Sequence, residues 1–123
     1  MPLIFKIESE SVWREAVATG WYAGADVDRS DGFVHFSTAQ QITETAQRHF
    51  RGRAGLLAVA FEASDFGDRL VWEPSRGGAL FPHLYPAAEG ARIGLDPTRA
   101  LWTMELPLGS DGVPIIPDRI LAC

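Results

Sequence analysis

The chain has 123 residues, of which 46% are hydrophobic, so it can bury one core but is too short for two independent ones. We therefore expect a single domain over residues 1–123. The formal charge of −5 and the presence of only one lysine exclude the clustered positive charge that nucleic-acid binding requires. The single cysteine, Cys123, cannot form an internal disulfide, and no apolar run is long enough to cross a bilayer. These features predict a cytoplasmic protein without a membrane partner.

The chain begins with a predicted strand and a predicted helix. Residues 3–7 are apolar and branched, as is typical of a strand. Ser9 or Ser11 can cap a helix that continues to about Thr19, and Gly20 is a suitable stop. A strand followed by a helix is therefore the expected start of the domain.

The next segment contains a predicted loop, a short strand and a second helix. Residues 21–30 have no clear hydrophobic period, so we expect a loop that presents Trp21 and Tyr22. Residues 33–36 are apolar and aromatic and predict a buried strand. A helix from about 39 to 50 is expected directly afterwards.

The second half of the chain is richer in predicted strands. The apolar runs 55–61 and 70–73 are interpreted as central strands, and residues 92–95 and 100–106 predict two more. Two helices early and several strands late predict an α+β domain, rather than one in which strands and helices alternate.

His35 is the first candidate for a functional residue. It lies in an aromatic strand immediately before Ser37 and Thr38, which resemble the start of a capping box with Gln40 and Gln41. A position beside a helix N-terminus favours contact with polar or anionic ligand groups. The alternative is a core histidine that donates to a backbone carbonyl, and the sequence leaves both open.

Glu73 is the second candidate, because it ends an apolar strand next to Trp72. Such a setting can raise the pKa of a carboxyl group and suit it to general-base catalysis. Glu73 can equally be a solvated strand end, or form a salt bridge with Arg76 three residues later.

The third candidate is His83, which stands between Pro82 and Leu84 and close to Tyr85. The prolines predict a conformationally restricted loop, and such loops often carry functional sites, although they also serve simply to pack a connection. We expect His83 and His35 to meet in one concave pocket with at least one aromatic neighbour. The candidate neighbours are Trp21, Tyr22, Trp72 and Tyr85.

These segments together resemble a known bacterial family, catalogued as domain of unknown function 952. The residues that carry the resemblance are 31–38, Gln40, His49–Phe50, Trp72–Glu73 and 78–85. The resemblance implies a fold related to the ADP-ribosyltransferases, in which two small split sheets hold NAD in a cleft. In that superfamily the first motif is a strand with His or Arg, a small residue and then Ser or Thr. His35 and Ser37 match this motif, whereas Phe36 stands where glycine is usual.

The resemblance also implies roles for individual residues, with NAD as a substrate. His35 would hold a ribose hydroxyl, Tyr22 or Tyr85 would stack on nicotinamide, and Glu73, or less plausibly Glu105, would stabilise charge on the ribose. The predicted catalytic residues are Glu73 and His35. The predicted ligand-binding residues are His35, Ser37, Thr38, Tyr22, Trp72, Arg76, His83 and Tyr85.

Three functional hypotheses follow. The first is an NAD-cleaving enzyme that transfers ADP-ribose or hydrolyses NAD. The second is a non-catalytic module that binds a nucleotide or another metabolite on the same fold. The third uses His35, His83 and Glu73 as metal ligands, but their spacing matches no known metal motif and we predict no metal. The sequence does not indicate the acceptor or the oligomeric state.

Overall fold

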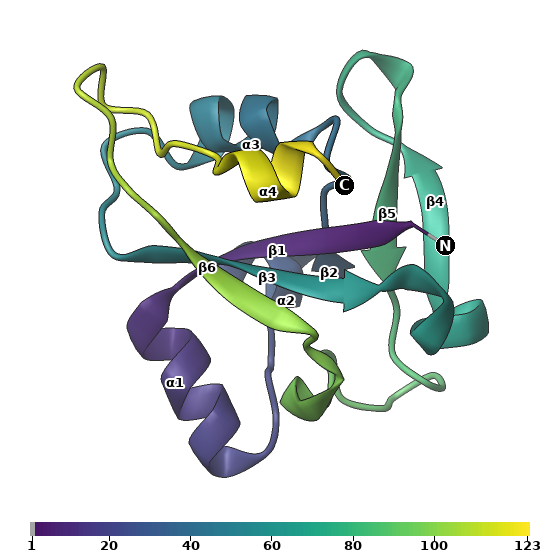
Figure 1. Cartoon of the computed structure of the whole chain (residues 1–123). Coiled ribbons are helices and arrows are strands. Elements are labelled where there is room, and N and C mark those ends of the chain that lie inside the picture. The colour runs from purple at the N-terminus through teal and green to yellow at the C-terminus, as the bar shows by residue number, and fades with distance from the viewer. Residues whose placement is uncertain (1) are drawn as a thin grey trace.

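The computed structural model describes residues 2–123, except for the side chain of Arg76, and it forms two three-stranded antiparallel sheets (Figure 1). The first sheet has the order β1-β3-β6, with β1 at Leu3–Ser9, β3 at Leu56–Glu62 and β6 at Trp102–Leu106. The second has the order β2-β5-β4, with β2 at Val34–His35, β5 at Leu80–Leu84 and β4 at Leu70–Pro74.

Helices pack around these sheets. The α-helices are α1 (Glu10–Thr19), α2 (Asp26–Asp31), α3 (Ile42–His49) and α4 (Asp118–Leu121). Short 3₁₀ segments occupy Ala63–Arg69, Arg76–Gly78 and Pro97–Arg99. The architecture is thus α+β, as the sequence predicts at that level. None of the helices in the described residues is both long enough and apolar enough to span a membrane.

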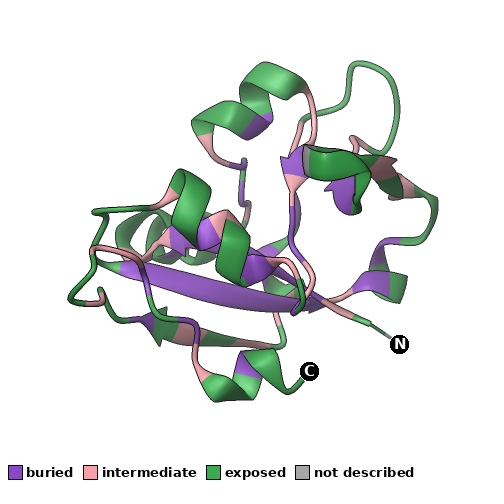
Figure 2. Cartoon of the chain, turned by 90° about the horizontal axis from the view of Figure 1, so that it is seen from above, coloured by how far each residue is buried: buried purple, intermediate pink, exposed green. Residues whose placement is uncertain are grey.

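The first sheet carries the core on both of its faces. Figure 1 shows α1 on one side of the sheet and α3 with α4 on the other. Residues of β3 alternate between the two sides, so that Val59 packs in one hydrophobic cluster and Ala58 in the other. In Figure 2, β1 is buried along most of its length, although it lies at the edge of its sheet. The chain after β2 and the helices therefore cover the free edge of β1.

The two sheets are joined at one point by backbone hydrogen bonds. Phe5 N donates to Ser37 O at 2.8 Å, and Ser37 N donates to Phe5 O at 2.9 Å. Because Ser37 is only two residues beyond the end of β2, these bonds fix β2 beside the middle of β1. This contact positions the functional site described below.

The start of the domain agrees with the sequence prediction. Ser9 caps α1, since its hydroxyl accepts from Val12 N at 3.3 Å, and Gly20 ends the helix in the left-handed conformation. The run 55–61 forms the central strand of the first sheet, and 100–106 contains its edge strand β6.

One predicted loop and one predicted helix differ from the structure. The predicted loop 21–30 contains most of α2, which has only six residues and too little apolar periodicity to be recognised. The predicted helix 39–50 begins only at Ile42, because Thr38 N donates to Gln41 Oε1 at 3.1 Å in a preceding turn. His35 therefore does not lie directly beside a helix N-terminus.

The second sheet also differs from the prediction. The run 70–73 is an edge strand, whereas the centre of the sheet is β5, which was expected to be a restricted loop. Proline is rare in central strands, so the presence of Pro82 argued against a strand at the position of β5. Residues 92–95 form no strand, and only Leu95 pairs with the backbone, through a bridge to Tyr22.

Candidate functional site

A cavity of about 740 Å³ is lined by residues of both sheets, and its size is typical of a small-molecule site. β1 contributes Lys6 and Glu8, while the second sheet contributes His35, Phe81 and His83. Further lining residues come from α2, α3 and the neighbouring loops, among them Asp26, Arg29, Asp31, Ser37, Thr45, Phe50 and Arg53. The cavity thus combines an apolar lining with both positive and negative side chains.

His35 and His83 lie together at this cavity. They are directly opposite one another in the β2–β5 pair, and residues in that position project to the same side of a sheet. Their ring centroids are 5.3 Å apart. Phe33 stacks on His83 with centroids 4.3 Å apart and also contacts His35 at 4.6 Å. The two histidines therefore converge on one cavity, as the sequence predicts, but the aromatic part of that prediction is wrong. None of the four expected neighbours lines the cavity, whose aromatic lining is phenylalanine: the four are Trp21, Tyr22, Trp72 and Tyr85.

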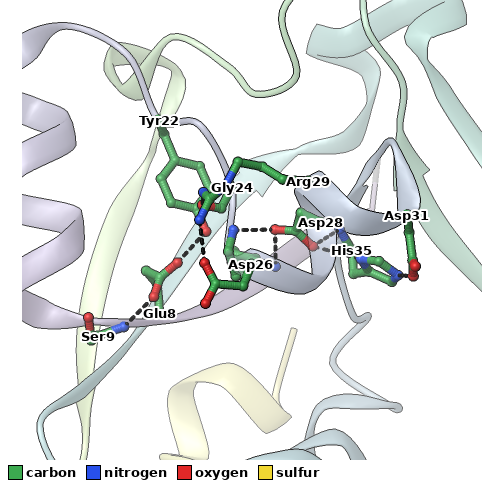
Figure 3. A network of polar contacts seen from close by, with 11 residues as sticks. Glu8, Ser9, Tyr22, Gly24, Asp26, Asp28, Arg29, Asp31 and His35 are labelled. Atoms are coloured by element: carbon green, nitrogen blue, oxygen red, sulfur yellow. Dashed lines mark hydrogen bonds and ion pairs between the residues drawn. The ribbon is translucent and has the colours of Figure 1, made fainter.

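His35 is fixed by a fully buried carboxylate, Asp28 of α2. His35 Nδ1 lies 2.6 Å from Asp28 Oδ1, and the His35 backbone N–H donates to the same oxygen at 3.0 Å. The second oxygen, Oδ2, accepts from Ala25 N at 2.8 Å and lies 2.7 Å from Lys6 Nζ. Figure 3 shows these contacts joining β1, α2 and β2. They hold the imidazole in one orientation at the cavity wall.

The charge of Asp28 is maintained by these partners. Burial alone would raise the pKa of its carboxyl group, but the hydrogen bond from His35 and the charge and hydrogen bond of Lys6 outweigh burial and lower the pKa to about 2. Asp28 is therefore ionised across the physiological pH range. A permanently charged carboxylate at Nδ1 favours a proton on that nitrogen.

The other ring nitrogen of His35 also faces a carboxylate. Nε2 lies 3.0 Å from Asp31 Oδ2. Both ring nitrogens thus lie within hydrogen-bond distance of a carboxylate oxygen. The Asp31 side chain is 46% exposed, and a ligand oxygen can replace it at Nε2.

His83 has a carboxylate partner of its own, Glu73. His83 Nδ1 lies 2.8 Å from Glu73 Oε1, which also accepts from the Tyr85 hydroxyl at 2.7 Å. The hydrogen bonds from Tyr85 and from His83 lower the pKa of Glu73, whereas the sequence suggested that its surroundings could raise it. Glu73 and Tyr85 are not among the residues that line the cavity, and they reach it through His83.

Tyr22 is buried rather than presented on a loop. Its ring packs edge-to-face against Trp13 with centroids 5.4 Å apart, and its hydroxyl donates to Glu8 Oε1 at 2.6 Å. Burial, and then the nearby Glu8 carboxylate, raise the pKa of Tyr22 far above its ordinary value. Since only 1% of Tyr22 is exposed, its ring is not available to stack on a ligand in this conformation.

The remaining predicted residues are spread more widely. The Ser37 hydroxyl lies at the cavity, 2.8 Å from Thr45 Oγ1, whereas Thr38 is not part of the lining. Trp72 pairs with Pro82, one position from His83, and so projects from the opposite face of the sheet. The Arg76 side chain lies outside the part of the chain that the structure describes. Glu105 is exposed on β6, on the far side of β3 from β1.

Sequence reasoning missed Lys6, Glu8 and Asp28. Lys6 is the only lysine, and Lys6 and Glu8 alternate with Phe5 and Ile7 in a strand that is otherwise apolar. Two charged residues at alternate positions of a buried strand are a usable signal, because buried charges require partners. Asp28 had no such signal, since its helix was not recognised.

Comparison with known proteins identifies the family. The family described as "Protein of unknown function (DUF952)" matches residues 7–94. The chain belongs to the DUF952 family. The matched range includes His35 and His83, as well as Glu8 and Asp28, and begins one residue after Lys6. None of the curated proteins matches the chain.

Solved structures of one relative share the whole fold of this DUF952 chain. The crystal structure of protein CC0527 from Caulobacter crescentus is 45% identical, with a TM-score of 0.88 over 98% of this chain and 99% of CC0527. The solution NMR structure of CC0527 is 43% identical, with a TM-score of 0.82 over 100% of both chains. These similarities establish the family and its α+β fold.

The cavity does not have the ligand arrangement of a metal centre in the described part of the chain. Within residues 2–123, no group of three or more His, Cys, Asp or Glu side chains is arranged to hold a metal ion. The histidines instead make paired contacts, His35 with Asp28 and His83 with Glu73. Such pairs orient imidazoles for contact with a ligand, or for proton transfer.

Proposed function

We propose that this protein binds NAD in the cavity between its two sheets and cleaves the bond between nicotinamide and ribose. The ADP-ribose would pass to an acceptor or to water, on a fold of the ADP-ribosyltransferase type. Support comes from the two small sheets, whose residues line one cavity together, and from the cavity volume.

The observation that carries the proposal is the fixed position of His35. A buried, ionised carboxylate holds Nδ1, while Nε2 lies at the cavity against the half-exposed Asp31. An oriented imidazole is suited to hold a ribose hydroxyl, because its ring nitrogen needs no reorganisation when the ligand arrives.

The proposed reaction is a substitution at C1′ of the nicotinamide ribose. The C1′–N bond breaks, its electron pair leaves with nicotinamide, and positive charge develops on the ribose. A nucleophilic oxygen or nitrogen of the acceptor forms the new bond to C1′ and gives up its proton. Glu73 would act in this step through His83, as a positioning residue that keeps the imidazole oriented.

A second candidate function is binding of NAD or a related nucleotide without cleavage. It is favoured by the position of Glu73, which does not line the cavity. Phe36, which stands where the ADP-ribosyltransferase motif usually has glycine, also lines the cavity. Release of nicotinamide distinguishes the two candidates.

Calorimetric titration of NAD into the purified protein tests the proposal. We expect saturable binding that weakens by roughly tenfold in His35→Ala, because a lost hydrogen bond in a binding site costs about 1 kcal/mol or more. Trp72→Ala is the matched control, since Trp72 projects from the opposite face of the same sheet. Absence of NAD binding, or equal loss in both variants, would contradict the proposed site.

A further inference from the structure

Glu8 is a buried carboxylate at the cavity whose role the proposed reaction leaves open. It lies on β1, is 5% exposed and lines the cavity. Its Oε1 accepts from the Tyr22 hydroxyl at 2.6 Å, and its Oε2 accepts from Ser9 N at 2.8 Å (Figure 3). Both contacts fix the carboxylate, and neither brings a positive charge to it.

The nearby cations are already engaged elsewhere. Lys6, on the same side of β1, pairs with Asp28 at 2.7 Å. Arg29 forms an ion pair with Asp26 and donates to Gly24 O. Among the described residues, none of the basic side chains lies within ion-pair distance of Glu8. A carboxylate that is removed from water without a counter-charge is costly, so its retention at a cavity wall indicates a ligand that supplies the charge.

We infer that Glu8 recognises the positive charge on the nicotinamide half of NAD⁺, and this inference rests on the proposed function. A carboxylate can accept about four hydrogen bonds, and Tyr22 and Ser9 use two of them. Glu8 therefore keeps free acceptor positions for a ligand. The oxidised nicotinamide ring is cationic, whereas the reduced ring of NADH has nearly the same shape without the charge. Glu8 thus makes the cavity selective for the oxidised cofactor.

The variant Glu8→Gln isolates the charge. The glutamine carbonyl can accept from Ser9 N, and its amide can donate to the Tyr22 oxygen when the hydroxyl turns away, so both contacts survive. Tyr22→Phe is the matched control, because it breaks the same pair but leaves the carboxylate charged. Thermal unfolding of both variants shows whether the fold is retained.

The decisive experiment compares the affinities of NAD⁺ and NADH for the wild-type protein and for both variants by calorimetry. Wild type should prefer NAD⁺ by about tenfold or more, Glu8→Gln should bind the two nearly equally, and Tyr22→Phe should keep most of the preference. Equal wild-type affinities, or an unchanged preference in Glu8→Gln, would overturn the role of Glu8 while leaving NAD binding intact. Wild-type protein that binds neither dinucleotide would overturn the proposed function itself. Equal wild-type affinities would overturn the role of Glu8 even if Glu8→Gln does not fold.

Discussion

Lys6 and Asp28 form a buried ion pair between β1 and α2, with Nζ and Oδ2 2.7 Å apart and side-chain exposures of 6% and 0%. This pair connects the first sheet to the helix that orients His35. The chain therefore builds its candidate site and part of its core from the same contacts, and changes in these contacts should affect stability and ligand binding together.

Replacing Lys6 with methionine should destabilise the protein by about 3–5 kcal/mol, because removal of one partner leaves Asp28 as an uncompensated buried charge. Urea denaturation measures the free energy of unfolding. The double variant Lys6→Met with Asp28→Asn should recover part of the loss, since the two residues interact directly. If the double variant lost as much free energy of unfolding as the two single variants combined, the interaction between Lys6 and Asp28 would contribute little to stability.

The stability of the protein should fall in acid because of Asp28. Its pKa is about 2 in the folded chain and 3.8 for an unperturbed carboxyl group. Its contribution is complete above about pH 4 and is lost as the pH falls towards 2, and it amounts to about 2 kcal/mol. Denaturation curves measured between pH 5 and pH 2 check this. Asp28→Asn should flatten the curve in that interval, and an identical slope in both proteins would contradict the assignment.

Gly94 should tolerate no side chain. It has a φ of +119°, and a Cβ atom there would lie 1.9 Å from Tyr22 O. Gly94→Ala is expected to cost at least about 2 kcal/mol, from backbone strain together with overpacking. Gly20→Ala is the matched control, because Gly20 also has a positive φ but has open space at the Cβ position. Thermal unfolding should place the Gly94 variant well below the Gly20 variant, and similar midpoints would contradict the close approach.

Glu73→Gln should abolish or greatly reduce nicotinamide release while leaving NAD affinity nearly unchanged. The amide can still contact Tyr85 and His83, but it lacks the negative charge that the carboxylate places beside His83. Glu105→Gln is the control for the alternative acid, and we expect it to match wild type because Glu105 is exposed on β6. Loss of release in the Glu105 variant alone would reverse the assignment.

The sequence predicted the elements that follow simple rules. Residues 3–7 and the helix capped by Ser9 have clear periodicity and caps, and the aromatic surroundings of His35 and His83 correctly indicated a shared cavity. Strand β5 was not recognised because Pro82 is unusual at the centre of a sheet.

The polar framework of the site was less predictable. Asp28 contacts His35 through a helix with little apolar periodicity, and Lys6 reaches Asp28 only after β1 and α2 have packed together. Such contacts depend on tertiary structure, so no pattern of residue spacing in the sequence reveals them. For the same reason Tyr22, expected on an exposed loop, is buried against Glu8 and Trp13.

Release of nicotinamide from NAD by the purified wild-type protein tests the central claim most directly. We expect free nicotinamide and ADP-ribose, or an ADP-ribosylated acceptor, to accumulate in equal amounts, and the rate to fall in His35→Ala. NAD that binds in the cavity and remains uncleaved would contradict the enzymatic account and support the binding module. If His35→Ala released nicotinamide as fast as the wild-type protein, the cleavage would not take place at His35.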